Sequence, residues 1–168
     1  MKNLILSLAV LVLVGCASVV QYGGSDKTIP ASSRIVLAPF LNATENPHAG
    51  PAIARLTATA LMDRKIGLYQ TEDLLNRTRE DTADTNSFLN IAREAGAAYL
   101  IAGTVHEYRY KTDLKGNPAV GLTLRLVAVN DGRTIWQGST AKVGLGFASL
   151  SSTGQDAVRE LVRRLPFR

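Results

Sequence analysis

The sequence predicts a single α/β domain, built on a mixed β-sheet with a C-terminal antiparallel meander and covered by about three helices. The chain has 168 residues, of which 46% are hydrophobic and 20% are charged. This length and composition suit one compact domain. Apolar residues recur at helical spacing in several segments, and a succession of strand-like runs fills the second half. Such a mixture is typical of helices packed on one sheet.

The N-terminus has the pattern of a bacterial lipoprotein signal. Lys2 precedes residues 4–14, which are apolar except for one serine. This run is shorter than the roughly 18 residues that a membrane-spanning helix needs, and it has the length and charge of a secretory signal peptide. It ends in Leu-Val-Gly-Cys16, which resembles the lipobox of bacterial lipoproteins. We therefore expect residues 1–15 to be a cleaved signal peptide and Cys16, the only cysteine, to carry the lipid, palmitate included.

Residues 16–33 are predicted to form a lipidated tether. They contain Gly23-Gly24, several serines and Pro30, without sustained periodicity, so no regular structure is expected. Ala17 follows the cysteine in place of the aspartate that tends to retain enterobacterial lipoproteins in the inner membrane. The expected location is therefore the periplasmic face of the outer membrane. The net charge of +5 is mild and scattered, so nucleic acid is not an expected partner.

The folded domain is expected over residues 34–168, in the order β-α-β-α-β-β-β-α. Short apolar and β-branched runs predict the strands, and apolar stripes at helical spacing predict the helices. Strands are predicted at residues 34–40, 67–70, 99–112, 120–128 and 134–145, and helices at residues 51–63, 87–95 and 152–165. Residues 72–86 are polar and acid-rich, with a helical turn at 73–75. Ser152 is predicted to open a capping box for the last helix, and Gly96 to end the second.

The strands of the meander should alternate between two faces. His106, Tyr108 and Tyr110 are predicted on one face of the first strand, with Val105 and Glu107 on the other. The sequence Asn130-Asp131-Gly132-Arg133 predicts the hairpin turn between the last two strands.

No pattern of catalytic or metal-ligating residues is present. His48 and His106 have no acidic or histidine neighbours at ligand spacing, and His106 is predicted to be a sheet-surface residue. Gly144-Leu145-Gly146 lacks the third glycine of a dinucleotide fingerprint. We therefore expect a protein that is not an enzyme, with no cofactor and no metal.

Two aromatic residues are candidate membrane contacts. Phe147 lies in a Gly-Phe-Ala-Ser loop without a strand pattern to bury it, and aromatic rings suit the headgroup region of a bilayer. Trp136 alternates with Ile135 and Gln137, so it either packs under a helix or faces outward.

Three stretches of the sequence resemble the PelC family of outer-membrane lipoproteins, which assist export of the Pel exopolysaccharide of biofilms. These stretches are residues 35–44, 105–121 and 132–138. The first is also similar to lipoproteins related to the curli secretion channel and to the penicillin-binding-protein activator. The segment Tyr-Lys…Gly-x-Pro-Ala-Val-Gly within 105–121 is the distinctive part.

The resemblance implies a non-enzymatic ring, expected to be a dodecamer, around the base of the outer-membrane porin PelB. It implies acidic groups facing the cationic, partly deacetylated Pel polysaccharide, for which the candidates are Glu107, Asp113 and Lys115. Lys115 stands where the family has an acidic residue before the glycine, and Phe147 where the family has a membrane-facing tryptophan. Outer-membrane lipid is a further expected partner.

Two alternative functions follow from the same group of lipoproteins. The first is a periplasmic lipoprotein activator of a cell-wall synthase, which usually has a longer linker than residues 16–33. The second is a self-sufficient secretion pore, which needs long alternating membrane hairpins. Residues 66–97 are too polar and helical to supply such hairpins.

Overall fold

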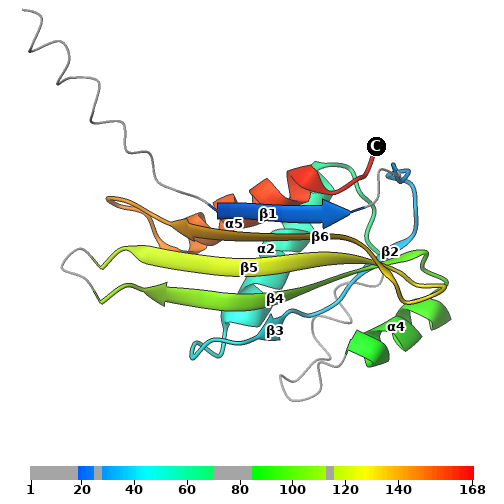
Figure 1. Cartoon of the computed structure of the whole chain (residues 1–168), viewed down its shortest axis with the longest axis horizontal. Coiled ribbons are helices and arrows are strands. Elements are labelled where there is room, and N and C mark those ends of the chain that lie inside the picture. Colours follow the sequence, from blue (N-terminus) through cyan, green and yellow to red (C-terminus); the bar gives the residue numbers. More distant parts are fainter. Residues whose placement is uncertain (1–18, 25–27, 70–84, 113–115) are drawn as a thin grey trace, which may run out of the picture.

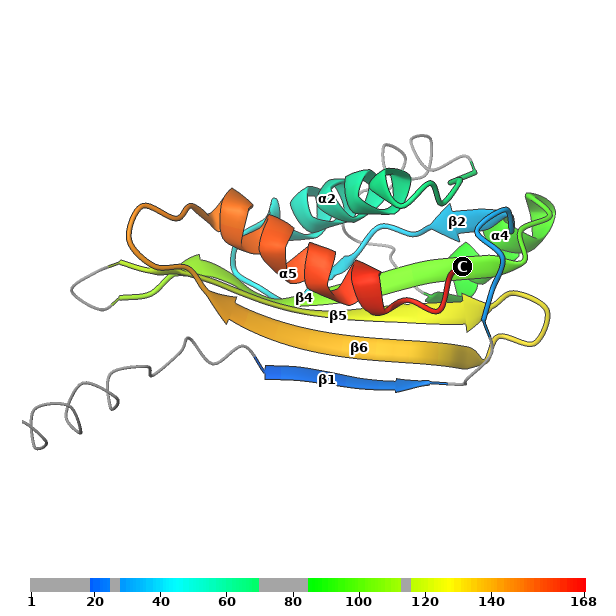
Figure 2. The ribbon, with the colours of Figure 1, turned by 90° about the horizontal axis from the view of Figure 1, so that it is seen from above.

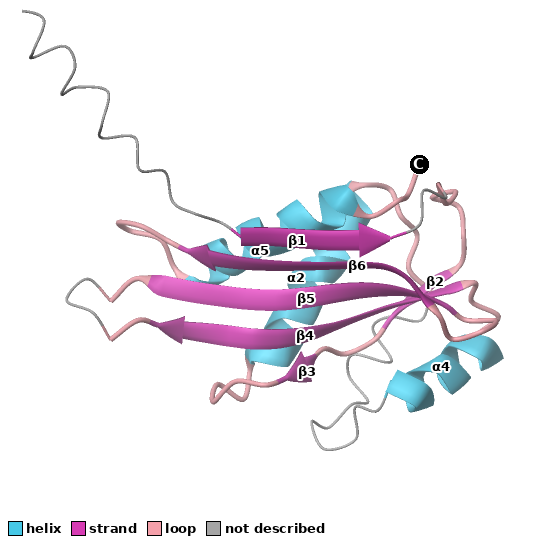
Figure 3. Cartoon of the chain, viewed as in Figure 1, coloured by secondary structure: helices cyan, strands magenta, loops and turns pink. Residues whose placement is uncertain are grey.

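The protein folds as one mixed β-sheet covered by helices, as predicted (Figures 1 and 3). The computed structural model describes residues 19–24, 28–69, 85–112 and 116–168. The strands are β1 (Val19–Gly24), β2 (Ile35–Leu37), β3 (Leu41–Asn42), β4 (Tyr99–Tyr110), β5 (Pro118–Ala128) and β6 (Thr134–Val143). The helices are α2 (Ala49–Asp63), α4 (Thr85–Glu94) and α5 (Leu150–Arg164). The sheet order is β1-β6-β5-β4-β2, with β3 also beside β4; β2 and β3 run parallel to β4 and the other pairs are antiparallel.

Two helices cover one face of the sheet, and the third covers one end of the other face. Figure 2 shows α2 and α5 side by side above the strands. Beneath them, Leu122, Leu124 and Leu126 of β5 are each at most 1% exposed. The neighbours Leu100 and Ile101 on β4 point to opposite faces, because Ile101 packs in the core under α2 and α5, and Leu100 packs with Phe88 of α4. The alternation of strand residues therefore builds two hydrophobic cores of unequal size.

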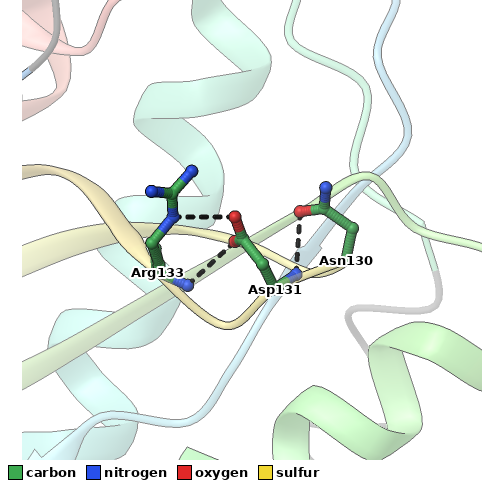
Figure 4. Close-up of polar contacts among 3 residues, drawn as sticks. All are labelled: Asn130, Asp131 and Arg133. Atoms are coloured by element: carbon green, nitrogen blue, oxygen red, sulfur yellow. Dashed lines mark hydrogen bonds and ion pairs between the residues drawn. The ribbon is translucent and has the colours of Figure 1, made fainter.

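The predicted meander is confirmed, and its last turn is fixed by side-chain hydrogen bonds (Figure 4). Asn130 Oδ1 accepts the Asp131 N–H at 2.9 Å, and Asp131 Oδ1 accepts the Arg133 N–H at 3.1 Å. Asp131 Oδ2 also accepts from Arg133 Nε at 2.8 Å. Gly132 has φ +71°, which only glycine adopts without strain.

The alternation predicted for the first meander strand is wrong beyond Val105. The register of β4 against β5 shifts between Val105 and Glu107, so His106 is the extra residue of a β-bulge. As a result, Val105 and Tyr108 both lie in the core under α2 and α5. A bulge re-aims every later side chain on its strand, and strict alternation cannot reveal it.

The prediction of an unstructured segment before residue 34 is wrong for β1. This strand pairs antiparallel with β6, from Val19 opposite Ala141 to Gly24 opposite Trp136. Gly24 is required there, because a Cβ would lie 2.8 Å from Trp136 Cδ1. Farther along, Ile29 is 3% exposed and its N–H donates to Pro166 O at 2.7 Å. The edge of β6 has backbone N–H and C=O groups that need hydrogen-bond partners. β1 supplies these partners, although its sequence shows no hydrophobic periodicity.

Two smaller predictions differ from the structure, and a third agrees with it. In the strand predicted at 67–70, the described residues 67–69 form only an isolated bridge between Ile35 and Leu68. The cap of α5 is Ser149, whose Oγ accepts the Ser152 N–H at 3.1 Å, so Ser152 is the reciprocal partner and not the cap. Gly96 follows α4 with φ +64°, which agrees with its predicted role as the helix stop. The turn predicted at residues 73–75 lies outside the described residues.

Gly103→Ala tests the packing between β4 and the segment after β2. A Cβ at Gly103 would lie 2.6 Å from Cζ of Phe40, whose ring is 4% exposed and cannot move aside. We expect the free energy of unfolding to fall by about 1–3 kcal/mol because of overpacking. Gly121→Ala on β5 is the matched control, since its Cβ would lie 3.4 Å from Glu107 Cβ. Urea unfolding followed by circular dichroism measures both, and equal midpoints for the two variants would contradict this account.

Candidate functional site

Exposed apolar side chains gather where β6 leads into α5. Phe147 is 109% exposed and Leu145 is 59% exposed, while Val143 at the end of β6 is 38% exposed. Tyr110, at the end of β4, is 52% exposed. Figure 1 shows that β4 and β6 finish at the same end of the sheet. We call Val143, Leu145, Phe147 and Tyr110 the apolar tip.

The loop of the apolar tip is held at both ends. On the strand side, Gly144 N–H donates to Pro118 O at 2.8 Å, and a Cβ at Gly144 would lie 2.5 Å from Thr153 Oγ1. On the helix side, Ser149 caps α5. Lys142 Nζ binds Glu160 Oε2 at 2.7 Å and so ties the end of β6 to α5. The exposed rings and methyl groups are therefore presented by a fixed loop.

The first strand begins at the same end of the sheet. Because β1 is antiparallel to β6, Val19 lies opposite Ala141, two residues before the end of β6. Cys16 lies outside the described residues, three positions before Val19. Three residues span at most about 11 Å. A lipid on Cys16 would thus be close to the apolar tip.

Phe147 remains a predicted membrane contact, but the structure excludes Trp136 from that role. Trp136 is 5% exposed and packs in the core under α2 and α5, so the other alternative, packing under a helix, is confirmed. Gly138 makes room for the indole, since a Cβ there would lie 2.7 Å from Trp136 Cη2. Leu145 and Val143 were missed by the sequence reasoning. The glycines on both sides of Leu145 were the available signal.

Of the three residues predicted to face the polysaccharide, the structure describes only Glu107. Glu107 lies on β4, and its Oε1 accepts from Arg109 Nη2 at 3.0 Å, which compensates its charge. Asp113 and Lys115 lie outside the described residues. The predicted acidic surface therefore remains a prediction.

The sheet face opposite α2 and α5 carries a polar row across three strands. His106 Nε2 is 2.9 Å from Thr123 Oγ1, which is 2.8 Å from Ser139 Oγ. His106 is exposed, as expected of a sheet-surface residue. Within the described ranges, no group of three His, Cys, Asp or Glu side chains is placed to hold a metal ion. None of the helices in that part of the chain is long and apolar enough to cross a membrane.

Tyr108 extends the core toward the apolar tip. It is 9% exposed, and a Cβ at Gly154 of α5 would lie 3.7 Å from its Cε2. Burial raises the pKa of the Tyr108 phenol, and the neighbouring Tyr110 adds to the effect. Tyr108 is therefore a neutral packing residue, in contrast to the exposed Tyr110.

Comparison with known proteins finds a likeness in fold but no matching family model and no matching curated sequence. The PelC dodecamer from Paraburkholderia phytofirmans is 25% identical, with a TM-score of 0.75 over 90% of this chain and 99% of that one. Lipoprotein GNA1162 from Neisseria meningitidis is 17% identical, with a TM-score of 0.59 over 79% and 97%. The C-terminal domain of LpoB from Salmonella enterica is 22% identical, with a TM-score of 0.50 over 67% and 84%.

These likenesses extend over most of the described domain and over most of each compared structure. The resemblance that the sequence predicted is therefore confirmed at the level of the fold. The chain has the α/β fold of PelC and of the lipoproteins related to it.

Proposed function

We propose that this protein is a non-enzymatic, lipid-anchored subunit of a ring that assists export of Pel exopolysaccharide through the PelB porin. The observation that carries the proposal is the likeness to the PelC dodecamer, which extends over 99% of that chain. The ring would lie at the periplasmic face of the outer membrane, with its subunits held by acylated Cys16 after removal of residues 1–15.

The arrangement of the sheet supports anchoring at one end. β1 begins beside the end of β6. The exposed residues Leu145 and Phe147 lie just beyond that end of β6. The lipid and the apolar tip would then meet the same bilayer surface. Several acyl chains hold far more firmly than a single chain, and the tip would orient each subunit.

A synthase activator is supported less well. The likeness to the LpoB domain has a TM-score of 0.50 and covers 67% of this chain. Pairing of β1 with β6 also takes up residues 19–24, which shortens the linker that an activator would use to reach through the cell wall.

Ring formation is the first test of the proposal. The lipidated chain, purified in detergent, should give a native mass close to twelve subunits, as in the PelC dodecamer. A closed ring needs a head-to-tail interface that repeats around one axis. Native mass spectrometry and light scattering measure the subunit number. A monomer at every concentration, with PelB present as well, would rule the ring out, and capture of a cell-wall synthase without the porin would favour the activator.

Cys16→Ser tests the anchor. Without the thiol there is no acceptor for the acyl chain, so we expect the protein to leave the outer-membrane fraction and metabolic palmitate labelling to disappear. Cell fractionation and labelling with an alkyne palmitate measure both. Ser18→Ala is the matched control, because it changes a residue of the same segment and leaves the Cys16 thiol in place. Unchanged labelling of the Cys16→Ser chain would disprove lipidation at this residue.

Phe147→Trp tests the membrane contact of the apolar tip. The lipidated chain is reconstituted into phosphatidylethanolamine–phosphatidylglycerol vesicles that contain brominated lipid. We expect the new tryptophan to be quenched, because an indole at this position would enter the headgroup region. Trp136 should give a constant background, since it is 5% exposed. Met62→Trp on α2 is the control, because Met62 is 58% exposed but distant from the tip. Equal quenching of the two variants would contradict a membrane contact at Phe147.

A further inference from the structure

A cleft of about 610 Å³ lies at the end of the sheet opposite the apolar tip. It is formed between the segment after α4, the β5–β6 turn, Ile29 in the β1–β2 connection and Pro166 after α5. Figure 1 shows the β5–β6 turn at the end far from the β6–α5 loop. Its volume is in the range of protein sites that enclose a ligand or a peptide side chain. The floor is mainly aliphatic and is made by Ile29, Ala97, Val129, Ile135 and Pro166.

One guanidinium at the rim is held in a fixed orientation. Asp131 accepts both the backbone N–H and Nε of Arg133, and Figure 4 shows the terminal nitrogens of Arg133 directed away from that carboxylate. The Arg133 side chain is 82% exposed. These hydrogen bonds from Arg133 lower the pKa of the Asp131 carboxyl, so the pair stays ionised at neutral pH. The Nη groups are left facing solvent beside the cleft.

A second guanidinium faces the same cleft. Arg93 donates from Nε to Val129 O at 3.2 Å and from Nη1 to Asn90 Oδ1 at 2.8 Å. Both acceptors are neutral. The rim therefore carries two positive charges, from Arg93 and Arg133, against the single negative charge of Asp131.

We propose that this cleft is a docking site for a short segment of a partner protein in which an apolar side chain lies next to a carboxylate. The aliphatic floor would bury the apolar side chain, and the arginine rim would bind the carboxylate. Guanidinium groups suit carboxylates because their planar N–H donors match the two oxygens. The excess of positive charge at the rim is the complement of an acidic segment.

The lining makes a sugar polymer a poorer occupant. Among the described residues that line it, Tyr99 alone is aromatic, so the cleft offers little flat aromatic surface on which sugar rings could stack. A cationic polymer would also meet two arginines. The opposite end carries the apolar tip, so the cleft would face the periplasm, and that part of the inference rests on the proposed function.

A pair of matched peptides tests the cleft on the full lipidated chain in detergent. The probe is fluorescein-labelled Gly-Leu-Asp-Phe-Glu-Leu-Gly, and its control has Asn and Gln in place of Asp and Glu. Fluorescence anisotropy should show the acidic peptide binding about tenfold more tightly, as expected for one charge-assisted hydrogen-bonded pair. Arg133→Gln should remove this preference. Arg159→Gln on α5, an exposed arginine away from the cleft, should leave it unchanged.

Ala98→Trp tests the volume of the cleft. Ala98 lines the cleft and is exposed, so an indole can fill the space without entering the core, and peptide binding should be lost. Equal binding of the two peptides, no binding of either, or full binding to Ala98→Trp would each overturn the proposal. So would competition by a glucosamine hexamer, or a change of subunit number in Ala98→Trp, which would identify a neighbouring subunit as the occupant. A wild-type monomer that still binds the acidic peptide would instead overturn only the proposed ring.

Discussion

The burial of the β5 leucines under α2 and α5 is the interaction on which the rest of the structure depends. Leu122, Leu124 and Leu126 are each at most 1% exposed, and full burial of one such side chain contributes about 1.5–3 kcal/mol. This packing decides which face of the meander is covered. It thereby fixes the path of β6 into α5, and with it the position of the loop that carries Leu145 and Phe147.

The two ends of the sheet consequently differ in chemistry. At one end, β6 runs into a glycine-containing loop that is held by Ser149 and by the Lys142–Glu160 ion pair, and its side chains are apolar and exposed. At the other end, the β5–β6 turn brings Arg133 and α4 brings Arg93 to an aliphatic cleft. One end suits a bilayer and the other suits an acidic partner. A subunit anchored at the first end would present the second to the periplasm.

Much of the fold could be predicted because its signals are local. The period of two in β5, the helical stripes of α2 and α5, and the turn at Asn130–Arg133 each depend on residues close together in the chain. The errors occur where contact with a segment distant in the chain determines the local structure. β1 forms because β6 has an edge to pair, and the bulge at His106 appears only in the register against β5. Trp136 is buried because Gly138 and α5 leave room for it.

The amino-acid sequence alone was sufficient for the fold class, the meander and the exposure of Phe147, and it predicts the lipid anchor at Cys16. These depend on composition and short-range pattern. Only the tertiary structure decided that residues 19–24 join the sheet, that Trp136 is unavailable to a membrane, and that Arg93 and Arg133 share one cleft. The physical reason is that strand pairing and the walls of a cleft join segments distant in the chain, and one-dimensional patterns carry no record of such contacts.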